Sequence, residues 1–240
     1  MAPAPKFSCE DQEKMILNAA VSVIEKTSLL DFSMSAIAKL AGLSMGSVYK
    51  FVQCKEDVLV ALATKMYQEK QKIFTQVLSL PLTTPERIIA NSLLDLSKVQ
   101  MYSFDDQLES IVNTRAMMKR CSRRWLDQMI ACGKVCEGIF QGFLQAAADS
   151  GELHSDGSDI EEISLGTWSL AVGYFQTVRL HQCWQNDADM ENNESLPALA
   201  PDNIHIRSMQ RLVNTYQWQH KVNDDDILKI CQCLTNKGLR

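Results

Sequence analysis

Three lysines lie in a stretch of the chain that contains no acidic residue. Lys39, Lys50 and Lys55 fall within residues 32–55, where no Asp or Glu occurs. Ammonium groups without neighbouring carboxylates can neutralise the phosphates of a nucleic acid. The whole chain has a net charge of −5, whereas residues 1–70 hold eight Lys and eight acidic residues and balance at zero. We therefore expect phosphate contact in this window, with weak non-specific binding because few phosphates would be neutralised.

The same window has the spacing of a helix-turn-helix centred on Gly42. Such a motif needs a residue that tolerates positive φ at the turn, a small residue four positions earlier where the helices cross, and apolar residues at fixed offsets. Ala38 is the small residue. The apolar positions are filled by Ile37, Ala41, Leu43, Val48 and Phe51. An ordinary pair of short core helices is the alternative, and the absence of acidic residues favours the DNA-binding interpretation.

No other group of residues has the spacing of a catalytic or metal site. The eight cysteines form no Cys-x-x-Cys pair, and Cys132 and Cys136 share a helix face without a histidine or second pair nearby. Buried reduced thiols are expected there, with a metal site as the alternative. The four histidines are scattered, and the fingerprints of hydrolases, zinc proteases and nucleotide-binding loops are absent. The sequence predicts no enzyme, no cofactor and no metal.

The elements that would position the basic window are all helical. Residues 10–26 carry Ile16, Ala20, Val23 and Ile24 on one face, which is typical of an amphipathic helix. Apolar period, caps and turns predict further helices at about 33–41, 44–51, 55–71, 85–101, 105–118, 122–149, 158–182, 202–219 and 224–236, and a polar loop at 186–201. The expected fold class is all-α.

Two features of the sequence bear on the cellular compartment of the protein. No apolar run approaches the roughly 18–20 residues of a membrane span, and the first residues have no apolar signal region. We expect a cytoplasmic protein.

The helix order around the motif resembles that of the TetR (tetracycline repressor) family of transcriptional regulators. One amphipathic helix precedes the motif, and another begins directly after it. The resemblance is carried by Ile37-Ala38-Lys39, Ala41-Gly42-Leu43-Ser44, Gly46-Ser47-Val48-Tyr49 and Lys55-Glu56. It is specific over about residues 10–62 and rests on helix order and length beyond them. It implies an N-terminal three-helix helix-turn-helix DNA-binding domain over 8–56 and a C-terminal helical bundle over 57–240 for effector binding and dimerisation.

The resemblance also implies a set of DNA-contacting residues. Ser44 to Ser47 would face the major groove, the Tyr49 hydroxyl would contact a phosphate, and Lys50 would reach a phosphate or a base edge. Ser33 would cap its helix while touching the DNA backbone, and Lys55 would hold another phosphate beside a helix N-terminus. The full set is Ser33, Ser35, Ser44, Met45, Gly46, Ser47, Tyr49, Lys50 and Lys55.

Five positions depart from the family pattern. Ser35 stands where a basic residue is common and Ala36 where an acidic capping partner is common. Phe51-Val52 replaces a pair that is often polar and aromatic, and Cys54 replaces the Ser or Asn that often caps the following helix. These changes remove charge, so a helical protein-interaction module with a degenerate DNA reader is the alternative function. Cys54 could sense oxidants, although a merely tolerated small residue is the preferred interpretation.

The segment 163–180 is suited to a subunit interface. The apolar residues of this helix occur around nearly its whole circumference, so it must be buried on two sides. One face carries Leu165, Trp168, Val172 and Phe175, and the other carries Gly166, Leu170, Gly173 and Tyr174. A central core helix of a monomer is the alternative. The resemblance implies a homodimer in which this helix and residues 202–219 form a four-helix bundle, so that two recognition helices read a palindrome in double-stranded DNA.

The rest of the chain, which carries the net negative charge, is far larger than DNA binding requires. The resemblance implies an effector pocket among the helices between about 85 and 182, for an unidentified small molecule whose binding shifts the spacing of the recognition helices. Candidate lining residues are Tyr102, Trp125, Phe140 and Trp168. Repression relieved by the ligand is the expected mode. The basic run at 115–124 is expected to be a solvated helix face, with an anionic effector or a second DNA segment as alternatives.

Overall fold

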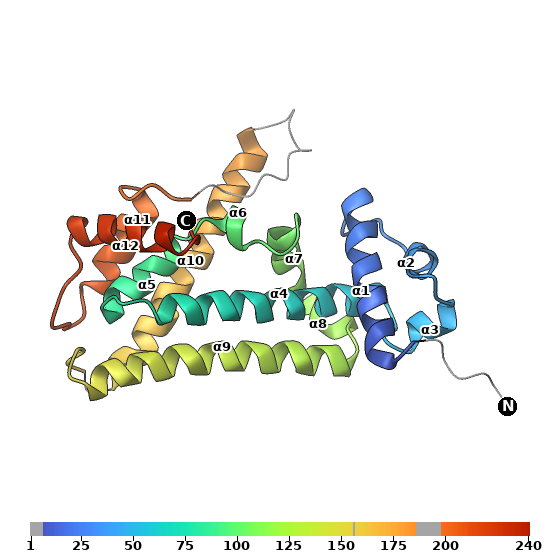
Figure 1. Ribbon diagram of the computed structural model, residues 1–240, viewed down its shortest axis with the longest axis horizontal. Coiled ribbons are helices and arrows are strands. Elements are labelled where there is room, and N and C mark those ends of the chain that lie inside the picture. The colour runs from blue at the N-terminus through green and yellow to red at the C-terminus, as the bar shows by residue number, and fades with distance from the viewer. Residues whose placement is uncertain (1–6, 156, 186–197) are drawn as a thin grey trace. The chain divides into compact units, whose positions relative to one another are not determined.

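The regular structure of the chain is helical, as predicted. The computed structural model describes residues 7–155, 157–185 and 198–240, and one isolated β-bridge, between Leu153 and Trp218, accompanies the helices in these ranges (Figure 1). The helices are α1 (Cys9–Lys26), α2 (Met34–Ala41), α3 (Met45–Tyr49), α4 (Lys55–Leu78), α5 (Thr84–Ser92), α6 (Leu96–Val99), α7 (Asp105–Val112), α8 (Arg115–Arg120), α9 (Arg123–Asp149), α10 (Ser158–Gln185), α11 (Ile204–Val213) and α12 (Asp224–Asn236).

The helices form two compact units. The first comprises Met1–Glu69 with Met101–Gly133, and the second comprises Lys70–Gln100 with Lys134–Arg240. The long helices α4 and α9 each contribute residues to both units. The DNA-binding domain expected over 8–56 lies in the first unit, which also contains residues 57–69 and 101–133.

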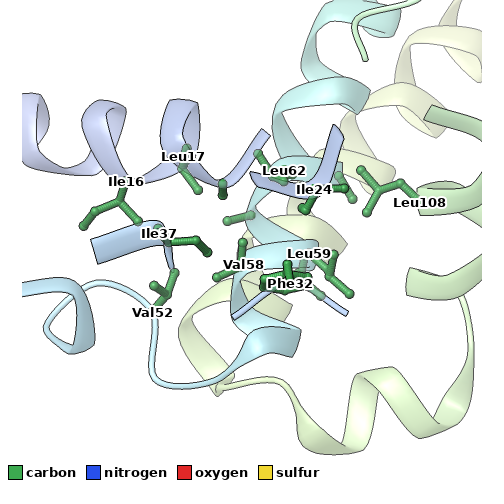
Figure 2. Close-up of a cluster of buried hydrophobic side chains, with 14 of the residues drawn as sticks. Ile16, Leu17, Ile24, Phe32, Ile37, Val52, Val58, Leu59, Leu62 and Leu108 are labelled. Atoms are coloured by element: carbon green, nitrogen blue, oxygen red, sulfur yellow. The ribbon is translucent and has the colours of Figure 1, made fainter. Parts of the chain in front are cut away.

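The first unit is built around the apolar face of α1. Ile16, Ala20, Val23 and Ile24 are all buried, which confirms the amphipathic pattern of this helix. Figure 2 shows the core that they join: Ile37 from α2, Val52 after α3, Val58, Leu59 and Leu62 from α4, and Leu108 from α7. Burying one such side chain contributes about 1.5–3 kcal/mol. This core therefore fixes α2 and the start of α4 against α1.

The second unit has its own core, in which α5 is central. This helix packs against both α11 and α12, and α10 packs against α11. Its N-terminus is held by the carboxylate of Glu152, which accepts hydrogen bonds from the Thr84 amide at 2.7 Å and the Thr84 hydroxyl at 2.6 Å. Core residues come from six helices: Val77, Ile89, Leu144, Ile163, Ile206 and Ile230.

The helix expected at 85–101 is interrupted because residues at the end of the chain take over its backbone groups. Arg240 donates to the Leu93 carbonyl at 2.7 Å, and the Asp95 amide donates to the Leu239 carbonyl at 2.9 Å. Asp95 then caps the short α6 through the Ser97 amide. These partners are distant in sequence, so local pattern could not reveal the break.

Two further expected helices are shorter than predicted. The helix at 105–118 breaks into α7 and α8, because the Thr114 side chain caps a new helix through the Met117 amide. The helix at 202–219 ends at Val213, because Asn214 exchanges side-chain hydrogen bonds with the backbone of Val222. The dimer segment expected there is therefore helical only in its first half.

Two remaining expectations concern a loop and a membrane. The polar loop expected at 186–201 lies outside the described residues for 186–197. Among the helices that are described, none is both long and apolar enough to cross a membrane.

Candidate nucleic-acid interface

The turn between α2 and α3 has the geometry that the sequence predicts. Gly42 has φ 66° and ψ 27°, in the left-handed region that glycine adopts without strain. The Leu43 amide donates to the Ala38 carbonyl at 3.0 Å and so closes the end of α2. The helix-turn-helix spacing of Ala38, Gly42 and Val48 thus corresponds to two helices joined by a tight turn.

Serines fix the start of both helices. The Ser33 hydroxyl accepts from the Ala36 amide at 3.1 Å at the start of α2. The Ser44 hydroxyl accepts from the Ser47 amide at 3.1 Å at the start of α3. Each of these hydroxyls also lies within about 3 Å of a second serine hydroxyl, on Ser35 and Ser47 respectively. Such caps typically stabilise a helix by about 1 kcal/mol, so the motif is locally rigid before any partner binds.

Helix α3, the predicted recognition helix, has one buried face and one exposed face. Val48 is completely buried in the first core, whereas its neighbour Tyr49 keeps 46% of its surface exposed and Met45 keeps 36%. Of the nine residues predicted to contact DNA, seven are exposed and two, Ser33 and Ser47, are half-buried. All nine are therefore at least partly accessible in the structure, and their contacts with DNA remain a prediction.

The side chain of Lys55, a predicted phosphate ligand, has partners inside the protein. Its ammonium donates to the Leu30 carbonyl at 3.3 Å and lies 5.1 Å from the centre of the Phe32 ring. These contacts tie the start of α4 to the segment between α1 and α2. Contact with a phosphate would have to compete with them, and this role of Lys55 remains a prediction.

Two residues that the sequence analysis did not assign to this site hold the chain just beyond α3. The indole of Trp125 donates to the Phe51 carbonyl at 2.9 Å. The carboxylate of Asp57, which is completely buried, accepts from the Gln53 amide at 2.8 Å and from the Ser122 amide at 2.7 Å. The segment after the recognition helix is thus bound to the start of α9. Asp57 lies in the first turn of α4 and its partner Ser122 is 65 positions away in the sequence, so no local pattern identified this role.

The electrostatic state of Asp57 follows from these hydrogen bonds. Burial by itself raises the pKa of the carboxyl, but the backbone N–H groups of Ser122 and Gln53 outweigh burial, so the pKa lies below the ordinary value. Asp57 is therefore ionised at neutral pH and provides a charged cap to two chain segments at once.

The basic run at 115–124 is mostly neutralised by the protein itself. Arg120 pairs with Glu56 at 2.7 Å, Arg123 with Asp127 at 2.9 Å, and Arg124 with Glu13 at 3.2 Å. All three arginines remain largely exposed. This arrangement favours the solvated helix face over the two alternative roles.

Burial makes the cysteines near the motif poor nucleophiles. Desolvation raises the pKa of Cys54 to about 11 and that of Cys121 to about 12. The Cys54 thiol lies 3.6 Å from the Arg120 carbonyl, in hydrogen-bonding geometry. Within the described ranges, no three His, Cys, Asp or Glu residues are grouped as metal ligands would be, Cys132 and Cys136 included.

The four candidate effector ligands lie in different surroundings. Tyr102 and Trp125 are buried in the first unit, where Tyr102 stacks on Phe104 at 5.3 Å. Phe140 belongs to the second unit and is half-buried, and Trp168 on α10 is 67% exposed. A pocket of about 470 Å³ opens beside α9 and α10 without any of the four; it is lined by Gly138, Gln141, Gly142, Gln145, Gly157, Ile160 and Glu161. Their roles in effector binding remain predictions.

Four large apolar side chains of α10 are exposed, Leu165, Trp168, Leu180 and Trp184, and no charged residue occurs between Glu162 and Arg179. Phe175 was expected on the same face as Trp168, but its ring lies 5.6 Å from that of His205 on α11. At Gly166 a Cβ would meet Leu212 of the same chain at 3.5 Å. Gly173 is exposed and has open space around it.

Comparison with known proteins adds a fold assignment. No model of a known protein family matches the sequence, and no curated protein matches it. Solved structures do match. A TetR-family transcriptional regulator from Cytophaga hutchinsonii superposes with a TM-score of 0.57 and 14% identity, covering 90% of this chain and 100% of its own. A TetR/AcrR-family regulator from Thermobifida fusca YX-ER1 gives 0.56 and 18%, covering 86% and 99%.

A third similar structure is that of the transcriptional regulator FadR from Bacillus subtilis in complex with stearoyl-CoA. Its TM-score is 0.52 at 18% identity, covering 84% of this chain and 96% of that one. At such identities the likeness establishes architecture. The chain has the all-α fold of TetR-family transcriptional regulators, with a helix-turn-helix in the N-terminal part.

Proposed function

We propose that this protein is a DNA-binding transcription regulator, acting as a repressor, that binds a palindromic operator as a homodimer and leaves it when a small-molecule effector binds. The observation that carries the proposal is the surface of α3. Tyr49 and Met45 are exposed beside a rigidly capped turn, with Lys50 exposed next to them and no acidic residue from 32 to 55. A helix presented in this way can enter the major groove without bringing acidic side chains close to the DNA phosphates.

The dimer is supported by the exposed apolar side chains of α10. Trp168 and Trp184 are each more than 60% exposed, on a helix without charge over its central part. Several large apolar side chains exposed on one helix mark an interaction site. A second copy of the same helix would cover these side chains symmetrically, and the symmetric pair would present two recognition helices to a palindrome.

Effector control is supported by the size of the second unit and by a relative of known structure. The second unit exceeds what presentation of α3 needs, and the structurally similar regulator from Bacillus subtilis holds stearoyl-CoA. An effector can change DNA affinity only by binding one arrangement of the dimer better than the other. We infer that the effector-free arrangement of the dimer is the one that fits the operator.

Selection of bound sequences from a random duplex library tests the proposal. Wild type, Tyr49→Ala and Leu30→Ala would be compared, because Leu30 is a 75% exposed apolar residue outside the predicted contact set. We expect an enriched palindrome with the wild type and Leu30→Ala, and none with Tyr49→Ala. Binding to random duplex should fall steeply with salt. A folded dimer without enrichment and without salt dependence would contradict the proposal and favour a protein-interaction module.

A further inference from the structure

One arginine in the second unit has a buried donor without a partner. The Nε of Arg87, on α5, is buried and has no hydrogen-bond partner among the described residues. The guanidinium carbon lies 5.6 Å from the centre of the Phe143 ring on α9. The guanidinium forms no ion pair with any residue in the described ranges. Arg87 as a whole is half-buried, and of its guanidinium atoms only Nε is both buried and unpartnered, so the positive charge stays accessible to an external anion.

The carboxylates next to Arg87 in the second unit are bound to other groups. Glu86 is 1% exposed; it accepts from the Thr83 amide and forms an ion pair with Lys229 at 3.0 Å. Glu152 accepts both the amide and the hydroxyl of Thr84. The acids around the start of α5 therefore stabilise the helix and leave the guanidinium without an anion.

Aromatic side chains line the same part of the second unit. Phe143 stacks near Phe140 with ring centres 6.1 Å apart, and Phe140 lies 5.7 Å from Phe74 of α4. All three rings are only partly buried. Arg87 thus adjoins an apolar surface that the protein does not cover completely.

A carboxylate matches the unused hydrogen-bonding capacity of a guanidinium, because it accepts two parallel N–H donors. We propose that Arg87 binds the anionic group of the effector, a carboxylate whose apolar body lies on Phe143 and Phe140. The inference rests on the proposed function, since it specifies the chemistry of the effector of that regulator. It adds Arg87 to Phe140, one of the ligand residues expected from the sequence.

The other buried unpartnered atom of the described chain does not serve this purpose. It is Nδ1 of His205, whose Nε2 lies 3.2 Å from the Ser92 hydroxyl and whose ring stacks on Tyr174 at 4.4 Å. Burial lowers the pKa of His205 to about 4, so the ring is neutral at pH 7. The positive charge that would select an anion therefore comes from Arg87.

Calorimetric titration of the free protein with matched probes tests the inference. The probes are 2-naphthoate against 2-naphthamide and decanoate against decanamide, which differ in charge but hardly in apolar body. The proteins are wild type, Arg87→Met and Lys98→Met, the last being a control that removes one charge from an exposed position of the same unit. We expect wild type and Lys98→Met to bind at least one carboxylate roughly tenfold or more tighter than its amide, and Arg87→Met to lose that preference.

Two results would overturn the inference: an unchanged preference in Arg87→Met, or no preference for either carboxylate in the folded wild type. Thermal unfolding without probe shows whether Arg87→Met folds, and we expect it to be at least as stable as the wild type because an unpaired buried donor is removed. The titration uses no DNA, so its outcome is independent of operator selection. If the protein binds a carboxylate but selects no operator, the proposed regulator function is wrong and the anion site at Arg87 stands.

Discussion

The indole N–H of Trp125 donates a hydrogen bond to the backbone carbonyl of Phe51 at 2.9 Å. Phe51 follows the recognition helix by two residues, and Trp125 belongs to the first turn of α9. Both residues lie in the first unit, and Trp125 is buried in its core. The carbonyl of Phe51 therefore accepts its hydrogen bond from a side chain that comes more than 70 positions later in the sequence.

Trp125→Phe should weaken operator binding through this contact. The variant keeps an aromatic ring but leaves the Phe51 carbonyl without its donor, which costs about 1 kcal/mol. If all of that free energy holds α3 in place, operator affinity falls roughly fivefold. The measurement is a binding titration with the selected operator.

A matched control exists in the second unit. Trp218 donates to the Val213 carbonyl at 2.8 Å, so Trp218→Phe removes the same kind of bond. Trp218→Phe should lower the melting temperature about as much as Trp125→Phe does, but it should not change operator affinity. Equal affinity losses in both variants would mean that the Trp125 contact has no special effect on α3.

Asp57→Asn should remove a pH-dependent part of the stability. The pKa of Asp57 in the folded protein lies below the ordinary value of 3.8, so its contribution is complete above pH 3.8 and is lost as the pH falls through the folded value. The amide also turns an N–H donor toward backbone N–H groups. We expect a loss of about 1–3 kcal/mol in the free energy of unfolding at pH 7.

Denaturant titrations at pH 7 and at pH 3 would measure this effect. The difference between wild type and variant should narrow at the lower pH, because the carboxyl of the unfolded chain is then largely protonated and the advantage of the folded carboxylate decreases. Asp127, an exposed partner of Arg123, offers the comparison: Asp127→Asn should change stability little at either pH. A constant gap between wild type and Asp57→Asn would show that the charge of Asp57 contributes nothing.

The helix-turn-helix could be predicted because its determinants are local. Gly42 at a positive φ, Ser33 and Ser44 as caps, and Val48 on a buried face all act within a few residues of one another. Apolar periodicity likewise predicted α1, whose four expected core residues are buried. Local rules of this kind apply wherever a residue and its partners lie within the same turn of helix.

What the sequence did not reveal depends on distant partners. The break after α5 requires Arg240, and the hold on Phe51 requires Trp125, which aromatic character alone had suggested as an effector ligand. The orientation of α10 shows the same limit: the periodicity grouped Phe175 with Trp168, whereas contact with His205 draws Phe175 inward. Periodicity identifies an apolar helix but not which of its faces the rest of the chain covers.

Gly173→Arg should produce monomers. Gly173 is exposed, and a Cβ at this position has nothing within 4 Å, so the protomer can accommodate the arginine while a helix packed on this face cannot. We expect a monomer by light scattering, with helical content unchanged, and loss of operator binding because one recognition helix reads too few base pairs.

Gly166→Ala is the control for that experiment. Its new methyl group would contact Leu212 of the same chain at 3.5 Å, which is an ordinary van der Waals distance. The variant should therefore remain a dimer with normal operator affinity. A dimer of normal affinity in Gly173→Arg would place the interface elsewhere than on α10.

Cys54→Ser should leave the response to peroxide unchanged. Thiolates, not thiols, react with peroxide, and burial raises the pKa of Cys54 to about 11, so almost none is ionised at pH 7. Cys121, in the same unit, has its pKa raised to about 12 for the same reason and offers no more reactive alternative. Operator release by hydrogen peroxide, followed by fluorescence anisotropy, should be equal in wild type and variant. Release that occurs in the wild type and disappears in Cys54→Ser would establish Cys54 as an oxidant sensor despite its buried thiol.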